Sequence, residues 1–97
     1  PDEVQKAYKK KYPNALIVEP VSIADDVKIE GSVVGPYTVL GKGCHIQSAI
    51  IKDSIIGDRT TIENEILEGS LIGSDVGVKG TTKNLNIGDT SQVKSNE

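Results

Sequence analysis

Aliphatic residues recur along most of the chain at a spacing of five or six positions. This spacing differs from the period of an α-helix, but it fits a strand of two or three residues followed by a turn. The pattern predicts a parallel β-helix of hexapeptide repeats. The recurring residues, called core positions below, are Ile23, Ile29, Val34, Leu40, Ile46, Ile51, Ile56, Ile62, Leu67, Ile72 and Val78. Glycine often follows directly, and we expect it to take positive φ at a corner at Gly35, Gly41, Gly57, Gly73 and Gly88.

The position two residues before each core position is nearly always small. Alternation along a strand puts it on the same side as the core residue, so one large and one small side chain share each inward ledge. Cys44 belongs to this class, and we interpret its thiol as a core group. Glu65 is the exception, and because a buried unpaired carboxylate is costly, we expect a locally irregular strand there. The small positions are Val27, Ser32, Thr38, Cys44, Ala49, Ser54, Thr60, Ser70 and Val76.

Three repeats make one coil if the cross-section is triangular. Leu40 then lies 17 residues after Ile23 and stacks on it, and Ile56 lies 16 residues after Leu40. We predict an all-β fold, a parallel β-helix of three to four short triangular coils, which needs caps at its ends. The pattern lapses at residues 79–86 and returns at residues 87–93, so we expect a loop or terminal cap there, followed by a frayed end at residues 94–97.

A short helix is predicted before the repeats. Tyr8 and Tyr12 fall on one side at helical spacing together with Val4 and Ala7, whereas the lysines fall on the other side, and Pro13 ends the helix. A lysine-rich helix could bind a membrane or a calmodulin-like protein, but with about three turns we interpret it as a cap over apolar surface. The predicted organisation is a helix and linker at residues 1–13 and a β-helix domain at residues 14–97.

The residue just before each core position must point outward, and the three walls of the coil differ there. The second wall presents polar residues and glycine: Lys28, His45, Thr61 and Gly77. The first and third walls present branched aliphatic residues: Val39, Ile55 and Leu71, and Val33, Ile50 and Ile66. Two adjacent apolar rows exceed what a soluble monomer usually exposes. If strand propensity alone explained these residues, the second wall would also be rich in Val and Ile, which it is not. We therefore expect both rows to form an interface with another subunit or domain.

Composition narrows the choice of partner and compartment. The 97 residues allow one small domain, and without Phe, Trp or Met its core must be aliphatic. Eleven basic and fourteen acidic residues give a net charge of −3, which offers no footprint for nucleic acid and no anchor for a membrane. One cysteine and no signal-like or membrane-spanning run favour the cytoplasm. The chain begins at Pro1, which suggests a processed product or a piece of a longer protein.

Candidate catalytic chemistry is sparse. The stretch from Gly35 to Lys42 has five residues between its glycines where a phosphate-binding P-loop has four, and Gly43 follows in place of Ser or Thr. His45 is the only histidine, so a zinc site of three histidines cannot be built in this chain. Acyltransferases of this repeat class use a histidine base beside a coenzyme A slot, but we interpret the lone His45 as surface. We predict no catalytic, cofactor-binding or metal-binding residue in this chain.

Several runs together resemble a known family, over residues 14–93. They are residues 18–29, 31–41, 54–57, 70–73 and 85–93. Single hexads are unspecific, but the run from Val34 to Thr38, Val-Gly-Pro-Tyr-Thr, is more specific. So is the closing Leu-x-Ile-Gly-Asp-x-Ser-x-Val from Leu85 to Val93. The chain resembles the C-terminal left-handed β-helix of long-form glucose-1-phosphate thymidylyltransferases, which are sugar-1-phosphate nucleotidyltransferases. The left hand of the coil is taken from this resemblance.

The resemblance implies a role in assembly or regulation beside a catalytic domain outside this chain. That domain joins a nucleoside triphosphate to a sugar 1-phosphate with Mg²⁺ and releases pyrophosphate. Its Gly-x-Gly-Thr-Arg-Leu stretch is missing here, so no catalytic, nucleotide or metal residue is carried over. The implied partners are a second copy of the chain and the missing catalytic domain. A hexapeptide acyltransferase and a stand-alone structural or oligomerisation module stay open as alternatives.

Overall fold

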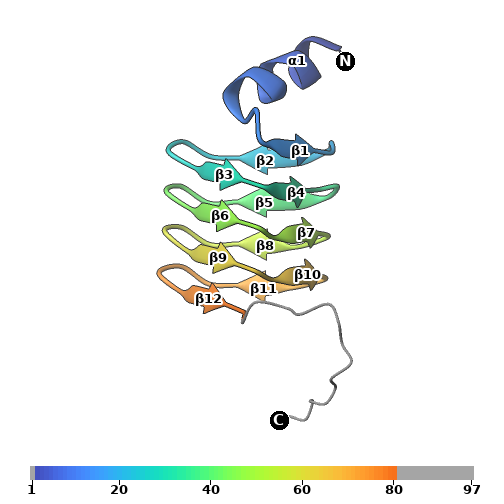
Figure 1. Cartoon of the computed structure of the whole chain (residues 1–97). Helices are drawn as coiled ribbons and strands as arrows, with labels where there is room; N and C mark the ends of the chain where they lie inside the picture. The colour runs from blue at the N-terminus through green and yellow to red at the C-terminus, as the bar shows by residue number, and fades with distance from the viewer. Residues whose placement is uncertain (1, 81–97) are drawn as a thin grey trace, which may run out of the picture.

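The structure of the protein is a computed structural model that describes residues 2–80 (Figure 1). The predicted fold is confirmed as a solenoid of about four coils with three parallel sheets and one short N-terminal helix. The sequence predicts a loop or cap from Lys79 onward, but Lys79 is the last residue of β12. The rest of that segment beyond Gly80, Gly88 with the returning repeat at residues 87–93, and the frayed end at residues 94–97 lie outside the described residues. The elements are α1 Asp2–Lys11, β1 Ala15–Ile17, β2 Val21–Ile23, β3 Lys28–Glu30, β4 Ser32–Val34, β5 Thr38–Leu40, β6 His45–Gln47, β7 Ile50–Lys52, β8 Ile55–Ile56, β9 Thr61–Glu63, β10 Ile66–Glu68, β11 Leu71–Ile72 and β12 Gly77–Lys79.

Each predicted wall is one parallel sheet in which every strand pairs with the strand one coil away. Sheet A runs β1-β4-β7-β10, sheet B runs β2-β5-β8-β11 and sheet C runs β3-β6-β9-β12. These sheets correspond to the third, first and second walls. Core positions stack in register, as Leu40 on Ile56 shows. The sequence pattern missed β1, which pairs Ile17 with Val34 and adds a fourth strand to sheet A.

The core positions point inward as predicted. In the middle coils they are almost completely buried, and Val34, Ile46, Ile51 and Ile62 have no exposed surface. Ile23, Leu67, Ile72 and Val78 are partly buried and pack against this core. These four residues lie in the first and last described coils, where a neighbouring coil covers only one side. The core is therefore a single aliphatic column along the solenoid axis.

Two tyrosines of the N-terminal segment cover the first coil. Tyr12 is 5% exposed and Tyr8 packs against the core cluster. The backbone N–H of Tyr12 donates a 2.7 Å hydrogen bond to the carbonyl of Tyr8, which continues the helical turn past α1. Burial raises the pKa of the Tyr12 hydroxyl. Val4 and Ala7 are exposed, so the capping stripe is narrower than the sequence predicted.

The small inward residues form hydrogen bonds between coils, which the sequence pattern alone did not indicate. The Ser32 hydroxyl donates to the Glu30 carbonyl at 2.7 Å and accepts the N–H of Ala49, in the next coil, at 3.0 Å. The Ser54 hydroxyl makes the same pair of bonds with Lys52 and Ser70. Buried polar groups are tolerated when they are hydrogen-bonded, and here they join successive coils.

The glycines at the corners have a different role from the one predicted. Of the four within the described residues, only Gly35 has a positive φ. A Cβ at Gly41 would lie 2.7 Å from the backbone nitrogen of Asp58, and a Cβ at Gly57 would lie 2.6 Å from that of Ser74. Glycine is needed there because successive coils approach closely. The positive φ angles fall mostly on Asp, Asn and other non-glycine residues: Asp26, Tyr37, Ser48, Asp53, Arg59, Asn64 and Asp75.

The irregular strand expected at Glu65 is not found. Ile66 pairs with Ile50 in the regular register, and the Ile50 N–H donates to the Glu65 carbonyl at 3.0 Å. The Glu65 side chain is only half-buried because it lies in the last described coil, where its carboxylate approaches Gly80. Its position at the end of the stack, rather than a break in the strand, accommodates the charge.

Candidate interaction surface

An apolar row runs along the outward face of sheet A. The parallel register stacks Leu16 on Val33, Val33 on Ile50 and Ile50 on Ile66. Leu16 is 58% exposed and Ile66 is 71% exposed, whereas Val33 is half-buried. Because each side chain comes from a different coil, the row extends over all four described coils. We call these four residues row A.

A second row runs along the outward face of sheet B, which lies next to sheet A around one corner. Ser22 stacks on Val39, Val39 on Ile55 and Ile55 on Leu71. Exposure increases along the chain from 40% at Val39 to 80% at Leu71. No strand of sheet B contains a charged residue. We call Val39, Ile55 and Leu71 row B.

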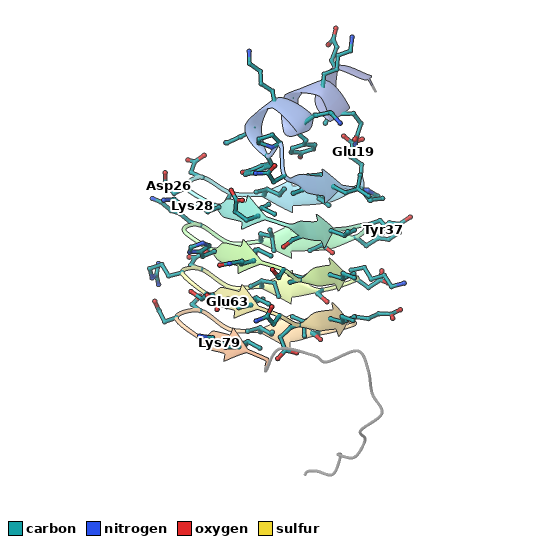
Figure 2. All side chains as sticks on the ribbon, in the orientation of Figure 1. Glu19, Asp26, Lys28, Tyr37, Glu63 and Lys79 are labelled. Atoms are coloured by element: carbon teal, nitrogen blue, oxygen red, sulfur yellow. The ribbon has the colours of Figure 1, made fainter. Side chains whose placement is uncertain are left out.

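The structure places all six predicted interface residues outward, and it adds two exposed side chains that the sequence analysis missed. Leu16 extends row A by one coil. Its signal was present, because Ala15, Leu16 and Ile17 repeat the small, outward and large positions of Ser32, Val33 and Val34. Tyr37 is 67% exposed and projects from the corner between sheets A and B (Figure 2). Nothing in the sequence indicated that Tyr37 would take a positive φ, which is 56° in the structure.

The outward face of sheet C is polar, as predicted. Lys28, His45 and Thr61 stack in register on β3, β6 and β9. His45 lies at a shallow groove of about 400 Å³ whose lining also includes Lys11 and Tyr12. The histidine stays exposed, and the interpretation of His45 as a surface residue is consistent with its position.

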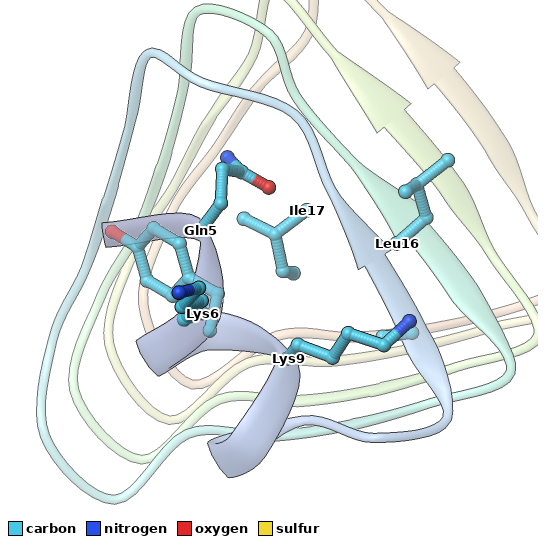
Figure 3. A pocket seen from close by; sticks show the side chains of 7 residues that line it. Gln5, Lys6, Lys9, Leu16 and Ile17 are labelled. Carbon is cyan, nitrogen blue, oxygen red and sulfur yellow. The ribbon is translucent and has the colours of Figure 1, made fainter. Parts of the chain in front are cut away.

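Charged side chains of both signs lie near row A. At the N-terminal end, Lys6 and Lys9 line a cavity of about 280 Å³ together with Leu16 (Figure 3). At the C-terminal end, Glu65 precedes Ile66 and Glu68 lies on the same strand, two residues after Ile66. Glu68 also pairs with Lys52 at 3.9 Å, but both side chains are exposed, so this ion pair contributes little to stability.

The corner between sheets B and C is held by an ion pair between coils. Arg59 donates two hydrogen bonds to the Asp75 carboxylate, from Nε at 2.7 Å and from a terminal nitrogen at 3.0 Å. This fork lowers the pKa of Asp75 and raises that of Arg59. The pair joins two successive coils at this corner.

The described residues assemble no catalytic centre that we can identify. Within residues 2–80, no three His, Cys, Asp or Glu side chains are grouped so that they could hold a metal ion. The thiol of Cys44 is buried and donates to the Gly57 carbonyl, as a core role requires. The one helix of the described part is too short and too polar to cross a membrane. The candidate site is therefore the apolar surface of sheets A and B.

Comparison with known proteins finds similarity to part of one longer protein. No family model matches it. Over 86 residues it is 34% identical to the bifunctional protein GlmU of Shouchella clausii (strain KSM-K16). The match covers 84% of this chain and 19% of that protein. The chain is thus a hexapeptide-repeat β-solenoid with a distant and partial similarity to GlmU.

Proposed function

We propose that the chain is the non-catalytic assembly part of a sugar-1-phosphate nucleotidyltransferase, and that rows A and B are its binding surface. The observation that carries the proposal is the contrast between the sheets. Sheets A and B expose continuous aliphatic rows, whereas sheet C exposes Lys28, His45 and Thr61. All three sheets are parallel and four-stranded, so strand propensity does not explain the difference.

The physical basis of assembly is the removal of these rows from water. Burial of apolar surface yields roughly 25 cal/mol for each Å², and the outward residues of a strand can be buried without disturbing the inward ledges. Leu71, at 80% exposure, and Ile66, at 71% exposure, can bury the most apolar surface in such a contact. The backbone of these strands is already paired within sheets A and B, so a partner can cover the rows without displacing a strand.

The reaction of the parent enzyme is part of the proposal and rests on the family resemblance. The parent would join glucose 1-phosphate to dTTP, giving dTDP-glucose and pyrophosphate. Its catalytic domain, with its Mg²⁺, would lie outside this chain and form the second partner of the apolar rows. The similarity to GlmU supports a β-solenoid attached to a larger enzyme, since the match covers 19% of that protein. The cytoplasm is the expected compartment.

Two measurements on the purified chain test the proposal. Light scattering behind a size-exclusion column should show self-association at tens of micromolar, where contacts of about 6–7 kcal/mol begin to populate complexes. Incubation with dTTP, glucose 1-phosphate and Mg²⁺ should release no pyrophosphate. A chain that stays monomeric would overturn self-assembly as its role, and turnover above background would overturn the non-catalytic assignment.

A second candidate function, acyl transfer, is favoured by one observation. His45 lies at the groove of about 400 Å³ with Lys11 and Tyr12, where a histidine could act as a base. Acyl transfer to a sugar by the parent protein, lost in His45→Ala and kept in the neighbouring variant Thr61→Ala, would favour this function over ours. We expect no such transfer, because the residues that line this groove beside His45 include no Ser, Thr or Cys.

A further inference from the structure

We propose that the groove beside His45, between the end of α1 and sheet C, binds the phosphate group of a small ligand. Lys11, Lys28 and His45 would hold the phosphate. The ligand is free phosphate or a phosphate monoester of a small molecule. This inference goes beyond the proposed assembly function and does not depend on it, because rows A and B lie on the other two sheets.

Three basic side chains border the groove, and each comes from a different element. Lys11 is the last residue of α1, Lys28 begins β3 and His45 begins β6. Lys28 and His45 stack in parallel register on neighbouring strands, which lie ~4.8 Å apart. The Lys11 ammonium lies 5.7 Å from the centre of the Tyr12 ring, which lines the same groove. The end of α1 and two successive coils thus contribute one basic group each.

The stacking of Lys28 on His45 differs from the charge pairing in the later coils. There, an outward cation pairs with a carboxylate one coil away, as in Lys52 with Glu68, Arg59 with Asp75, and Lys79 with Glu63. Lys28 instead stacks on a second base, and like charges directly opposite on neighbouring strands are unfavourable when the imidazole is protonated. Among the described side chains, neither Lys11 nor Lys28 forms an ion pair. A bound anion would supply the missing negative charge.

Glu30 is the one acidic residue in the lining of the groove. Its carboxylate accepts a hydrogen bond from the side-chain amide of Asn14 at 3.4 Å. Two lysines against one glutamate leave the lining with a net positive charge, and protonation of His45 increases it. This balance favours an anion over a metal cation as the ligand.

The floor of the groove is apolar and well packed. Tyr12, Val27 and Ile29 line it and are at most 5% exposed. Walls of low dielectric constant strengthen the field of the basic groups at the rim. The volume of about 400 Å³ lies within the range of small-molecule sites, so an organic group attached to the phosphate can also be accommodated.

His45 is the only histidine of the chain, so its ring-proton signal in a nuclear magnetic resonance spectrum reports directly on the groove. We would titrate the full chain with inorganic phosphate and with glucose 6-phosphate at about pH 6.5, where imidazole is partly protonated. Sodium chloride at equal ionic strength and glucose are the controls. Both phosphates should shift the signal saturably, and neither control should. Tighter binding of the ester would identify a monoester as the ligand, whereas equal binding would identify free phosphate.

Substitutions in the lining test which side chains hold the phosphate. Lys28→Ala and Lys11→Ala should each weaken phosphate binding about tenfold, through loss of a charge-assisted hydrogen bond. Lys79→Ala is the matched control, because Lys79 lies on the same sheet but in the last described coil, and its effect should stay within about twofold. Glu30→Gln keeps the shape of the side chain and should strengthen binding about threefold, because it removes a negative charge beside the anion.

Two results would overturn the proposed site. One is a shift of the His45 signal that chloride reproduces at equal ionic strength, since this would reflect screening alone. The other is unchanged phosphate affinity in both Lys28→Ala and Glu30→Gln. Circular dichroism of each variant confirms that it is folded. Self-association of the chain is measured separately by light scattering, so a failure of the phosphate site leaves the assembly function untouched.

Discussion

The Thr60 hydroxyl donates a 2.7 Å hydrogen bond to the carbonyl oxygen of Gly73 in the next coil. The Thr60 hydroxyl oxygen also accepts a hydrogen bond from the backbone N–H of Val76 at 3.3 Å, so one side chain serves two backbone groups of the following corner. Thr60 has no exposed surface. The small inward residues thus join successive coils by hydrogen bonds as well as filling space.

Thr60→Val should lower the free energy of unfolding by about 1 kcal/mol, because the Gly73 carbonyl and the Val76 N–H would lose their partner at a partly buried site. Chemical denaturation followed by circular dichroism measures this. Thr61→Val is the matched control, since Thr61 lies on the outward face of sheet C and we expect a change within about 0.5 kcal/mol. Equal effects at the two positions would contradict the assigned hydrogen bonds.

Gly41→Ala should destabilise the chain by about 1–3 kcal/mol through overpacking. Its Cβ would lie 2.7 Å from the Asp58 backbone nitrogen, which cannot move without shifting the next coil. Gly73→Ala occupies the same corner position one coil beyond Gly57, and no atom lies within 4 Å of its Cβ. Thermal unfolding of the two variants should separate them clearly, and a stable Gly41→Ala protein would show that the coils are spaced more widely.

The bond between Arg59 and Asp75 should make stability depend on pH in the acidic range. The pKa of Asp75 is lowered in the folded chain, so the stabilisation is present above the unfolded pKa of about 4 and is lost as the pH falls through the folded pKa. Melting temperatures should be measured from about pH 7 down to about pH 2, a range that spans both pKa values. The melting temperature should fall less on acidification in Asp75→Asn than in the wild type. Both side chains are exposed, so the effect should be small and should weaken with salt. Parallel pH profiles of the two proteins would exclude a contribution from this pair.

His45→Ala should leave the fold and the assembly unchanged. The histidine is exposed on the polar sheet, and surface substitutions of this kind usually alter stability by less than about 0.5 kcal/mol. Denaturation midpoints and light scattering of the variant check this. If His45→Ala abolished assembly, the interface would have to include sheet C, and the assignment to sheets A and B would be wrong.

The sequence predicted the sheets and most of the site because both follow from alternation along short strands. Once the core positions were known, the outward position of Ile55 or Leu71 was determined by the period of two. β1 keeps the same spacing, since Ile17 lies six residues before Ile23, but the sequence analysis counted the repeats only from Ile23 onward. The corners could not be predicted in the same way. Glycine is needed at position 41 because a side chain there would collide with Asp58, a residue of the next coil. Glu65 is tolerated because it lies in the last described coil of the stack.

The full length of row A was clear only from the fold. Leu16 and Ile66 are far apart along the chain, and the parallel register places them at the two ends of one apolar row. Leu16 belongs to the strand that the sequence analysis did not include. The helix was predicted, but its position beside Leu16 depends on how α1 contacts β1.

The central claim is that the outward rows of sheets A and B drive assembly, and sedimentation of one double variant tests it most directly. Ile50→Lys combined with Ile55→Lys places a charge in the middle of each row, where an unpaired buried lysine would cost several kcal/mol at a contact. Lys28→Ala on sheet C and Thr61→Lys, which adds a charge there, are the controls. We predict that the wild type and both controls associate at tens of micromolar, a range set by contacts of about 6–7 kcal/mol, whereas the double variant is a folded monomer. A folded double variant that associates as strongly as the wild type would contradict the claim.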